Sequence, residues 1–262
     1  MICDVGVVVP TFNRFNETVR AVESVKSQTL APKRILVIDD GSEKEISEKL
    51  KNYMRDLEVE FLSVGPHRHP GIVRNYGISN LDTEWVAFLD SDDVWLPHKL
   101  EKQMMLAENS KCQAMCSNAF VNNVESNIEY FKETGPSEIS LRKLLKSNQI
   151  INSSAVVKRK LLQEIGGIAS SYMTRGSEDY ASWLRVSVFE NWKYDSEPLL
   201  VYFDNSLDSL RSSNEFEQKY IQYCGILDFQ SWLESKSLTN KLLVASYLKF
   251  LPFLVNFSRK FI

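Results

Sequence analysis

Short apolar runs, rich in β-branched residues, recur along the first half of the chain, and polar residues follow each run. The runs at 5–9, 34–38, 59–64 and 85–89 predict strands that are buried on both faces of a sheet. Apolar residues spaced three or four positions apart lie between the runs and predict helices, the first at about 16–28. Strands that alternate with helices in this way predict a doubly wound α/β fold.

The second half of the chain is patterned less regularly. Strands are predicted at 113–121, 128–131, 152–157 and 192–203. Helices are predicted at 97–108, 137–147 and 158–165. A further helix is expected to begin after Ser177, which would cap it. In the first half, Ser42 and Glu45 have the spacing of a capping box, so we expect the Ser42 side chain to cap the second helix.

The last part of the chain differs in character. Residues 241–262, KLLVASYLKFLPFLVNFSRKFI, are rich in Leu, Phe and Val, contain no acidic residue and carry four basic ones. Pro252 would kink or end a helix there. The segment has two interpretations: it lies on an anionic membrane surface, or it docks as a helix on the domain or on a second subunit.

Composition and charge remove several classes of function. The chain is 44% hydrophobic and 25% charged, and its net charge of −3 gives no general attraction to nucleic acid. None of the four cysteines belongs to a CxxC pair, so we expect reduced, packed thiols in a cytosolic protein. We expect neither a signal peptide nor an apolar run long enough to span a bilayer. The glycine patterns of a dinucleotide site and of a P-loop are absent.

Polar residues follow three of the predicted strands, and ligands of open α/β sheets bind at the carboxyl ends of strands. Thr11 follows the first strand, Asp40 the second, and Asp90, Asp92 and Asp93 the fourth. Three carboxylates within four positions raise one another's pKa unless a cation binds among them. Mg²⁺ or Mn²⁺ that holds a phosphate suits such hard oxygen ligands, although a solvated acidic turn is the alternative.

Five motifs carry a resemblance to a known family. They are VVVPTFNR (7–14), DDGS (39–42), RNYGI (74–78), FLDSDDVW (88–95) and SEDYASWLRV (177–186). In this order the chain resembles the GT-A fold, family 2 inverting glycosyltransferases of bacterial polysaccharide assembly. The resemblance implies a Rossmann-like mixed sheet flanked by helices, with a helical tail at the C-terminus.

The resemblance also implies an organisation of the chain. The catalytic domain would occupy residues 1–210, with a nucleotide-binding half at 1–95 and an acceptor half at 96–210. Residues 211–262 would form a helical extension that either associates with a membrane or packs on the protein.

The resemblance assigns the donor nucleotide to residues of the first half. Pro10 and Thr11 would line the nucleotide site, with Arg14 either there or in a surface ion pair. Asp40 would accept a hydrogen bond from the uracil N3–H, unless it only complements a helix N-terminus. Arg74 would reach the diphosphate, because its planar guanidinium donates two hydrogen bonds at once.

The same resemblance places a metal and the acceptor chemistry. Asp92 would contact the ribose or a Mn²⁺ or Mg²⁺ ion, Asp93 would bind that ion, and Asp90 would support them. Asp179 would act as general base on the acceptor hydroxyl, with Glu178 orienting it. The alternative is that both carboxylates only favour the N-terminus of their helix.

The sequence departs from the family pattern in two places. The family's histidine near the end of this region is missing from 202–207, and Asn205 stands about where it would be. The stretch before Arg74 contains His67 and His69, which we expect to face solvent, the alternative being contact with phosphate or metal.

These residues together predict an inverting hexosyltransferase that uses a UDP-hexose, with glucose or galactose favoured. The acceptor would be an undecaprenyl-diphosphate-linked sugar of O-antigen or capsule synthesis. The protein would be cytoplasmic and peripheral on the inner face of the cell membrane. Two alternatives are a non-catalytic sugar-nucleotide-binding scaffold and a sugar-1-phosphate nucleotidyltransferase. The second lacks its expected glycine-rich loop here.

Overall fold

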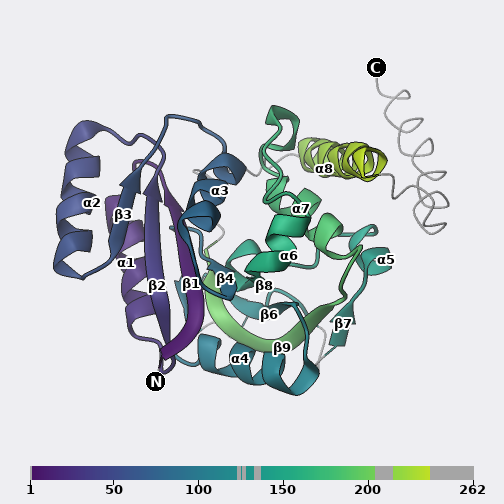
Figure 1. The fold of residues 1–262 in the computed structure, drawn as a ribbon, viewed down its shortest axis with the longest axis horizontal. Coiled ribbons are helices and arrows are strands. Elements are labelled where there is room, and N and C mark those ends of the chain that lie inside the picture. The colour runs from purple at the N-terminus through teal and green to yellow at the C-terminus, as the bar shows by residue number, and fades with distance from the viewer. Residues whose placement is uncertain (1, 123–124, 126–127, 133–136, 204–214, 237–262) are drawn as a thin grey trace.

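The computed structural model describes residues 2–122, 125, 128–132, 137–203 and 215–236. Within them the chain forms one mixed sheet of nine strands in the order β3-β2-β1-β4-β8-β6-β9-β5, with β7 paired to β9 (Figure 1).

The first half forms the parallel part of the sheet. Its strands are β1 (Ile2–Thr11), β2 (Ala31–Asp39), β3 (Glu60–Ser63) and β4 (Trp85–Phe88). The helices between them are α1 (Phe15–Lys26), α2 (Lys44–Asp56) and α3 (Pro70–Asn80). β1 pairs in parallel with both β2 and β4, and β2 with β3. The predicted alternation of strands and helices is confirmed here.

The second half adds strands of both directions. They are β5 (Val94–Trp95), β6 (Ala114–Val121), β7 (Ser137–Ile139), β8 (Val156–Lys158) and β9 (Trp192–Tyr202). β8 runs antiparallel between β4 and β6, whereas β6 and β9 are parallel. The helices are α4 (Lys99–Ser110), α5 (Leu141–Leu144), α6 (Arg159–Glu164), α7 (Glu178–Val186) and α8 (Glu215–Ser235). Two short 3₁₀ helices are η1 (Asn152–Ser154) and η2 (Tyr172–Thr174).

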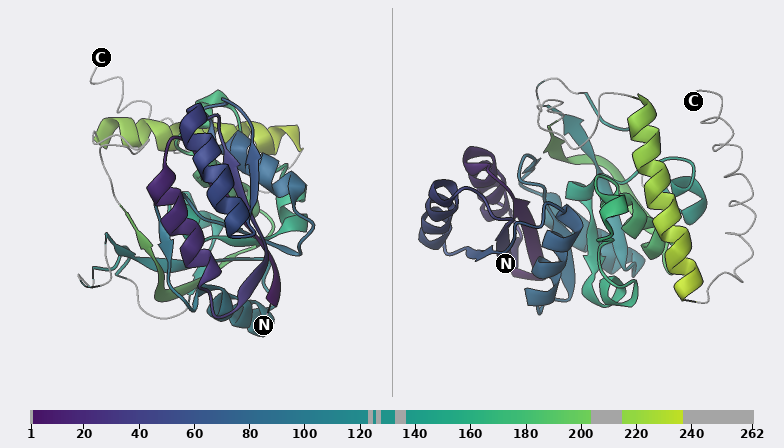
Figure 2. Two further views of the ribbon diagram at one scale, coloured as in Figure 1. Left: turned by 90° about the vertical axis from the view of Figure 1, so that its left-hand side faces the viewer. Right: turned by 90° about the horizontal axis from the view of Figure 1, so that it is seen from above.

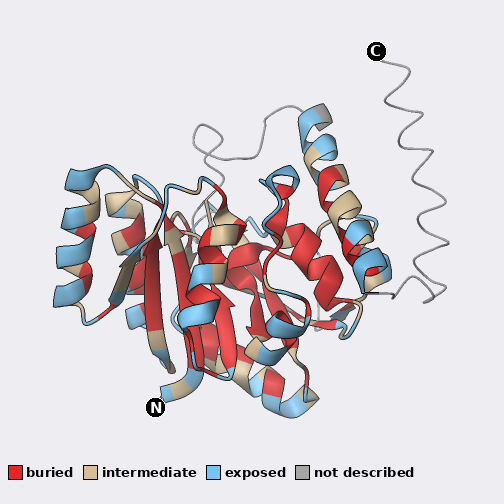
Figure 3. Cartoon of the chain, turned by 45° about the horizontal axis from the view of Figure 1, so that its top comes forward, coloured by how far each residue is buried: buried red, intermediate tan, exposed pale blue. Residues whose placement is uncertain are grey.

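Helices cover both faces of the sheet because neighbouring strand residues point to opposite sides. Val7 and Val9 of β1 pack with α1, α2 and α4 in one apolar cluster. Val8 packs on the other face with α3, α6, α7 and α8. Figure 3 shows the strands largely buried and the outer faces of the helices exposed. The β-branched runs are therefore apolar throughout because both of their faces are covered.

Several local predictions are wrong in detail. Residues 152–157 begin as the 3₁₀ helix η1 and become the strand β8 only from Val156. Residues 137–147 contain the strand β7 before the short helix α5. The predicted strand 128–131 makes only an isolated bridge between Phe120 and Glu129. β7 forms where residues 137–139 pair with β9, a contact between distant segments that the local pattern does not show.

Of the two predicted serine caps, Ser42 is wrong and Ser177 is right in position only. Glu43 occupies the N-cap position of α2 without a side-chain bond, and the Ser42 hydroxyl instead donates to Asp39. Ser177 is the N-cap residue of α7, but its side chain accepts no capping hydrogen bond.

Helix α8 packs against α7 and η2 and lies across one end of the domain (Figure 2). Its residues Phe229, Trp232 and Leu233 belong to the same apolar cluster as α7. α8 therefore shares the core of the preceding residues, while the basic, apolar segment 241–262 lies outside the described part of the chain. Among the described residues, no helix has both the length and the apolar character needed to cross a membrane.

Candidate active site

A cavity of about 510 Å³ opens at the carboxyl ends of β1, β2 and β4. Nine of the ten predicted site residues line it: Pro10, Thr11, Arg14, Asp40, Arg74, Asp90, Asp92, Glu178 and Asp179. Residues more than a hundred positions apart are thus brought together where parallel strands end.

The two aspartates of the DDGS motif have different surroundings. Asp39 is fully buried, and its carboxylate accepts hydrogen bonds from the backbone N–H of Ser42 at 3.1 Å and the Ser47 hydroxyl at 2.7 Å. Asp40 lines the cavity and accepts from the backbone N–H groups of His67 and Arg68, both at 2.7 Å. Asp39 therefore closes the turn, and Asp40 presents a fixed carboxylate to the cavity.

The loop after β3 can hold Asp40 only because Gly65 has no side chain. Gly65 has a φ of +103°, and a Cβ at this position would lie 2.5 Å from the Asp40 carboxylate. Any other residue would be strained and would displace the carboxylate.

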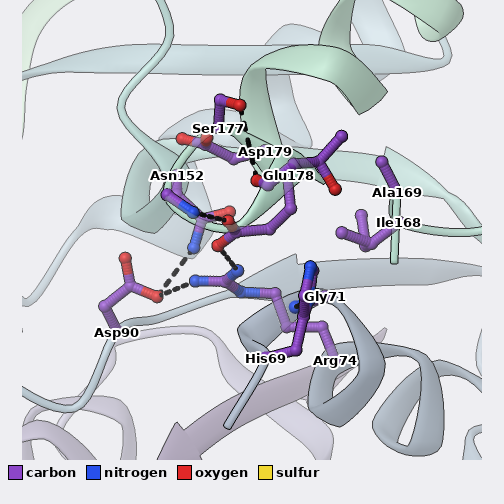
Figure 4. Close-up of polar contacts among 12 residues, drawn as sticks. His69, Gly71, Arg74, Asp90, Asn152, Ile168, Ala169, Ser177, Glu178 and Asp179 are labelled. Carbon is purple, nitrogen blue, oxygen red and sulfur yellow. Dashed lines mark hydrogen bonds and ion pairs between the residues drawn. The ribbon is translucent and has the colours of Figure 1, made fainter. Parts of the chain in front are cut away.

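A buried ionic network joins the two halves of the site (Figure 4). Arg74 donates from Nη2 to Asp90 at 2.6 Å and from Nη1 to Glu178 at 2.8 Å. The Asn152 amide also donates to Asp90, at 2.8 Å. Burial by itself would lower the pKa of Arg74, but the charges of Asp90 and Glu178 raise it above its usual value. Arg74 of α3 thus connects the end of β4 with the start of α7.

Asp92 faces the cavity beside a cation. Its carboxylate lies 2.6 Å from Nη1 of Arg14, and its backbone carbonyl accepts from Arg20 at 2.9 Å. Burial, followed by the nearby charge of Asp90, raises the pKa of Asp92, and Arg14 opposes that rise. The ion pair that was an alternative for Arg14 is therefore present, and it lies inside the predicted site.

Asp93 is the predicted site residue that does not line the cavity. It is 1% exposed, and its carboxylate accepts from the Ser153 hydroxyl and from the backbone N–H of Phe203. Burial and the charges of Asp92 and Asp90 raise its pKa well above the usual range. The structure thus places Asp93 beneath the acidic turn, contrary to the expectation that it faces a metal ion.

A metal ion at this site would have to be coordinated largely by oxygen atoms of a bound diphosphate and by water, with few protein ligands. In the described part of the chain, no group of three or more His, Cys, Asp or Glu residues is arranged to bind one. Mg²⁺ commonly takes one or two carboxylates and completes its shell with phosphate oxygens and water. The cavity-facing carboxylate of Asp92 fits a metal of that kind, bound together with a diphosphate.

Glu178 and Asp179 begin α7, where acidic side chains complement the positive end of the helix dipole. Glu178 is buried, and it accepts from Arg74 and from the backbone N–H of Gly176 at 2.7 Å. Asp179 is half-buried and accepts from the backbone N–H of Tyr180 at 2.7 Å. Glu178 is thus held in place by its neighbours, whereas Asp179 extends to the cavity.

Two sequence-based questions are settled by burial. His69 is fully buried, in contrast to the solvent-facing position that we expected. Its Nε2 contacts the carbonyl of Ser171 at 2.8 Å, and its Nδ1 accepts from the backbone N–H of Gly71 at 3.2 Å. For Trp183 the sequence left two orientations open, toward the sugar or toward the core; it packs in the core, with its ring centroid 4.9 Å from that of Trp192.

Asn152 is one of several cavity residues that were not predicted from the sequence, because its segment resembled the interior of a strand. It precedes β8, which runs antiparallel to β4, so the start of β8 lies at the carboxyl end of β4. An asparagine a few residues before an apolar strand is the signal that could have indicated it, given the strand's direction.

The sequence was compared with known families and curated proteins. The family model described as "Glycosyl transferase family 2" matches residues 6–166. The chain is 27% identical over 225 residues to the UDP-Glc:alpha-D-GlcNAc-diphosphoundecaprenol beta-1,3-glucosyltransferase WfgD of Escherichia coli, with 86% of each chain covered. The chain is also 37% identical over 106 residues to an uncharacterized glycosyltransferase of Rickettsia bellii. That match covers 40% of this chain and only 15% of the length of the Rickettsia protein.

Solved structures share the fold. Residues 1–349 of TarS from S. aureus, in complex with UDP-GlcNAc, superpose with a TM-score of 0.70 at 16% identity, covering 93% of this chain and 69% of that one. The mannosyltransferase PcManGT from Pyrobaculum calidifontis, in complex with GDP-Man and Mn²⁺, gives a TM-score of 0.56 at 15% identity, covering 96% and 80%. These likenesses confirm the predicted GT-A fold.

Proposed function

We propose that this chain, which belongs to glycosyl transferase family 2, transfers a hexose from a UDP-sugar to a lipid-linked sugar acceptor. The observation that carries the proposal is the cavity at the carboxyl ends of the strands. The cavity is lined by the fixed carboxylate of Asp40, which can bind a nucleobase, and by the carboxylate of Asp179. Two arginines, Arg14 and Arg74, line it as well, each beside a carboxylate.

The donor nucleotide is placed by the first half of the site. Asp40 accepts the N3–H of uracil, and its carboxylate is already oriented by two backbone N–H groups. Arg14 lies beside Asp92 and supplies positive charge for the diphosphate. We favour UDP-glucose or UDP-galactose, and the name of the E. coli relative WfgD specifies UDP-glucose as its donor.

Asp92 is the residue that we propose for Mn²⁺ or Mg²⁺, and PcManGT was solved with Mn²⁺. When bound, the ion would neutralise charge on the leaving diphosphate. Asp93 keeps the acidic turn in position from below through its bonds to Ser153 and Phe203.

Asp179 is the proposed general base. The acceptor oxygen forms a bond to the anomeric carbon, the bond from that carbon to the diphosphate oxygen breaks, and its electron pair leaves with UDP. The proton of the acceptor hydroxyl passes to the Asp179 carboxylate. A single displacement inverts the configuration and gives a β-linkage. Arg74 holds Glu178, the neighbour of Asp179, and acts as a positioning residue.

The acceptor is proposed to be a sugar on undecaprenyl diphosphate, used for a surface polysaccharide such as O-antigen or capsule. WfgD, by its name, acts on such a lipid. The protein would work at the cytoplasmic face of the membrane, and the basic, apolar segment 241–262 would contact anionic lipids.

The test is a donor screen with purified protein and Mn²⁺. UDP-, GDP- and dTDP-sugars are supplied with and without a short-chain α-D-GlcNAc-diphosphate-lipid, and the released nucleotide is measured. We expect release from one UDP-hexose that increases with the lipid. The Asp179→Asn variant should retain UDP binding and lose transfer, while Asp56→Asn, an exposed substitution on α2, should change neither.

A scaffold that only binds sugar nucleotides is the alternative. It would bind UDP with measurable affinity and release no nucleotide from any donor. Asp179→Asn would then have no activity to remove, and Asp179 would be a charge at the helix N-terminus.

A further inference from the structure

A second, smaller cavity of about 150 Å³ adjoins the first. The two cavities share three lining residues: Ile151, Gly176 and Asp179. The proposed general base therefore stands at the boundary between them. A base must contact the hydroxyl that attacks, and the attacking group must come from the side away from the donor diphosphate.

The lining of the second cavity has the chemistry of a sugar site. Asn148, Gln218 and Gln222 contribute amide side chains, which both donate and accept hydrogen bonds. Tyr130 and Phe131 contribute aromatic rings on the same cavity. A sugar suits both kinds of group, because its hydroxyl groups can bond to the amides and its apolar ring face can pack on an aromatic ring.

The charges of this lining select against an anionic occupant. Of the described residues that line the second cavity, Asp179 is the only one with a charged side chain. A phosphate or a uronic acid there would meet that carboxylate without a cation from the described lining, which is unfavourable. A neutral sugar meets no such penalty.

Helix α8 supplies one wall of this cavity. Gln218, Ile221 and Gln222 are spaced three and four positions apart and so share one helix face. Gly225 continues that face, and a Cβ there would lie 3.2 Å from both the Ser177 hydroxyl and the Tyr180 ring. The absence of a side chain at Gly225 brings α8 close enough to α7 to close the cavity.

We propose that the second cavity binds the neutral pyranose of the acceptor, and that α8 determines which sugar is accepted. This rests on the proposed function, since it assigns the other substrate of the same reaction. The amides bind hydroxyls of the sugar, and one further hydroxyl points to Asp179. Acceptor choice is thus made by a helix beyond residues 6–166, the part that matches the family model.

The first experiment measures binding without transfer. Protein saturated with UDP is mixed with methyl α-D-N-acetylglucosaminide, methyl α-D-glucoside or methyl α-D-glucuronide, and contact is detected by saturation-transfer NMR. We expect a neutral glycoside to bind and the glucuronide not to bind. Ile221→Trp, which fills the cavity from a half-buried position, should abolish the signal while calorimetry still detects UDP binding.

The second experiment uses kinetics with the short-chain α-D-GlcNAc-diphosphate-lipid. Gln218→Ala and Gln222→Ala should each raise the KM for the acceptor about tenfold, since each removes hydrogen bonds from a site built to form them. The KM for the UDP-sugar should change much less. Gln230→Ala is the matched control, because this glutamine of α8 bonds to Glu234 and does not line the cavity.

The outcomes separate the two proposals. Binding of no neutral glycoside, or binding that Ile221→Trp leaves intact, would overturn the acceptor site. The acceptor site would also be overturned if the protein transfers sugar and neither glutamine variant changes the KM for the acceptor. The proposed function would then still stand. Glycoside binding that Ile221→Trp removes, in a protein without transferase activity, would retain the sugar site and reject the proposed function.

Discussion

The Arg74 network allows a quantitative prediction. Arg74 is 5% exposed, and its partners Asp90 and Glu178 are 31% and 6% exposed. Arg74→Met keeps much of the side-chain volume and removes the charge. Two carboxylates then lose their cation, and Glu178 is left charged in a buried position. Removing one partner of a buried ion pair typically costs about 3–5 kcal/mol, because the remaining charge is uncompensated.

The chain contains a matched control at its surface. Arg34 also contacts two carboxylates, Glu60 at 2.7 Å and Asp82 at 3.3 Å, but these partners are 46% and 70% exposed. Ion pairs open to solvent contribute roughly 1 kcal/mol or less. Arg34→Met should therefore lower the free energy of unfolding by much less than Arg74→Met, although both remove an arginine with two acidic partners.

Urea denaturation of ligand-free protein at neutral pH measures both effects. The midpoint should fall further for Arg74→Met than for Arg34→Met, with similar slopes. Where Arg74→Met alone is too unstable to purify, the double variant Arg74→Met/Glu178→Gln should recover stability because no buried carboxylate is left unpaired. Equal losses for the two arginine variants, or no recovery in the double variant, would refute the reasoning.

Three further predictions concern single side chains. Burial lowers the pKa of Lys99 well below 10.5, so the unfolded chain binds more protons than the folded one and wild-type stability should rise with pH toward about 10. Lys99→Met should therefore have a higher urea midpoint than the wild type at pH 7. The difference between the two midpoints should shrink at pH 9.5. Asp92→Asn should raise the Mn²⁺ concentration that supports half-maximal nucleotide release at least about tenfold, and EDTA should stop release by the wild type. Asn152 has a buried Oδ1 without a hydrogen-bond partner among the described residues, so Asn152→Ala should raise the KM for the UDP-sugar several-fold and leave UDP affinity unchanged in calorimetry.

The parallel half of the fold was predictable from sequence because its determinants are local. A run such as residues 5–9 is apolar at every position because both faces of β1 are covered, and this pattern is visible without knowing the partners. The carboxyl ends of parallel strands lie at one edge of the sheet. Thr11, Asp40 and Asp90 could therefore be grouped from the sequence once the strands were placed.

Contacts between distant segments decided what the sequence did not show. Arg74 and Glu178 are 104 positions apart, and no local pattern pairs them. Asn152 reaches Asp90 only because β8 returns antiparallel beside β4. The motif also does not reveal that Asp93 turns inward while Asp92 faces the cavity, since that depends on Ser153 and on the backbone of Phe203.

In the first half of the chain, the sequence by itself determined the strands, the helices between them and the polar residues at their ends, because periodicity and strand-end chemistry are properties of neighbouring residues. Tertiary structure alone decided which of those residues share a cavity and how each is charged. Burial and the approach of distant groups set these properties, as for the pKa of Asp92 and for the wall that α8 adds beside Asp179.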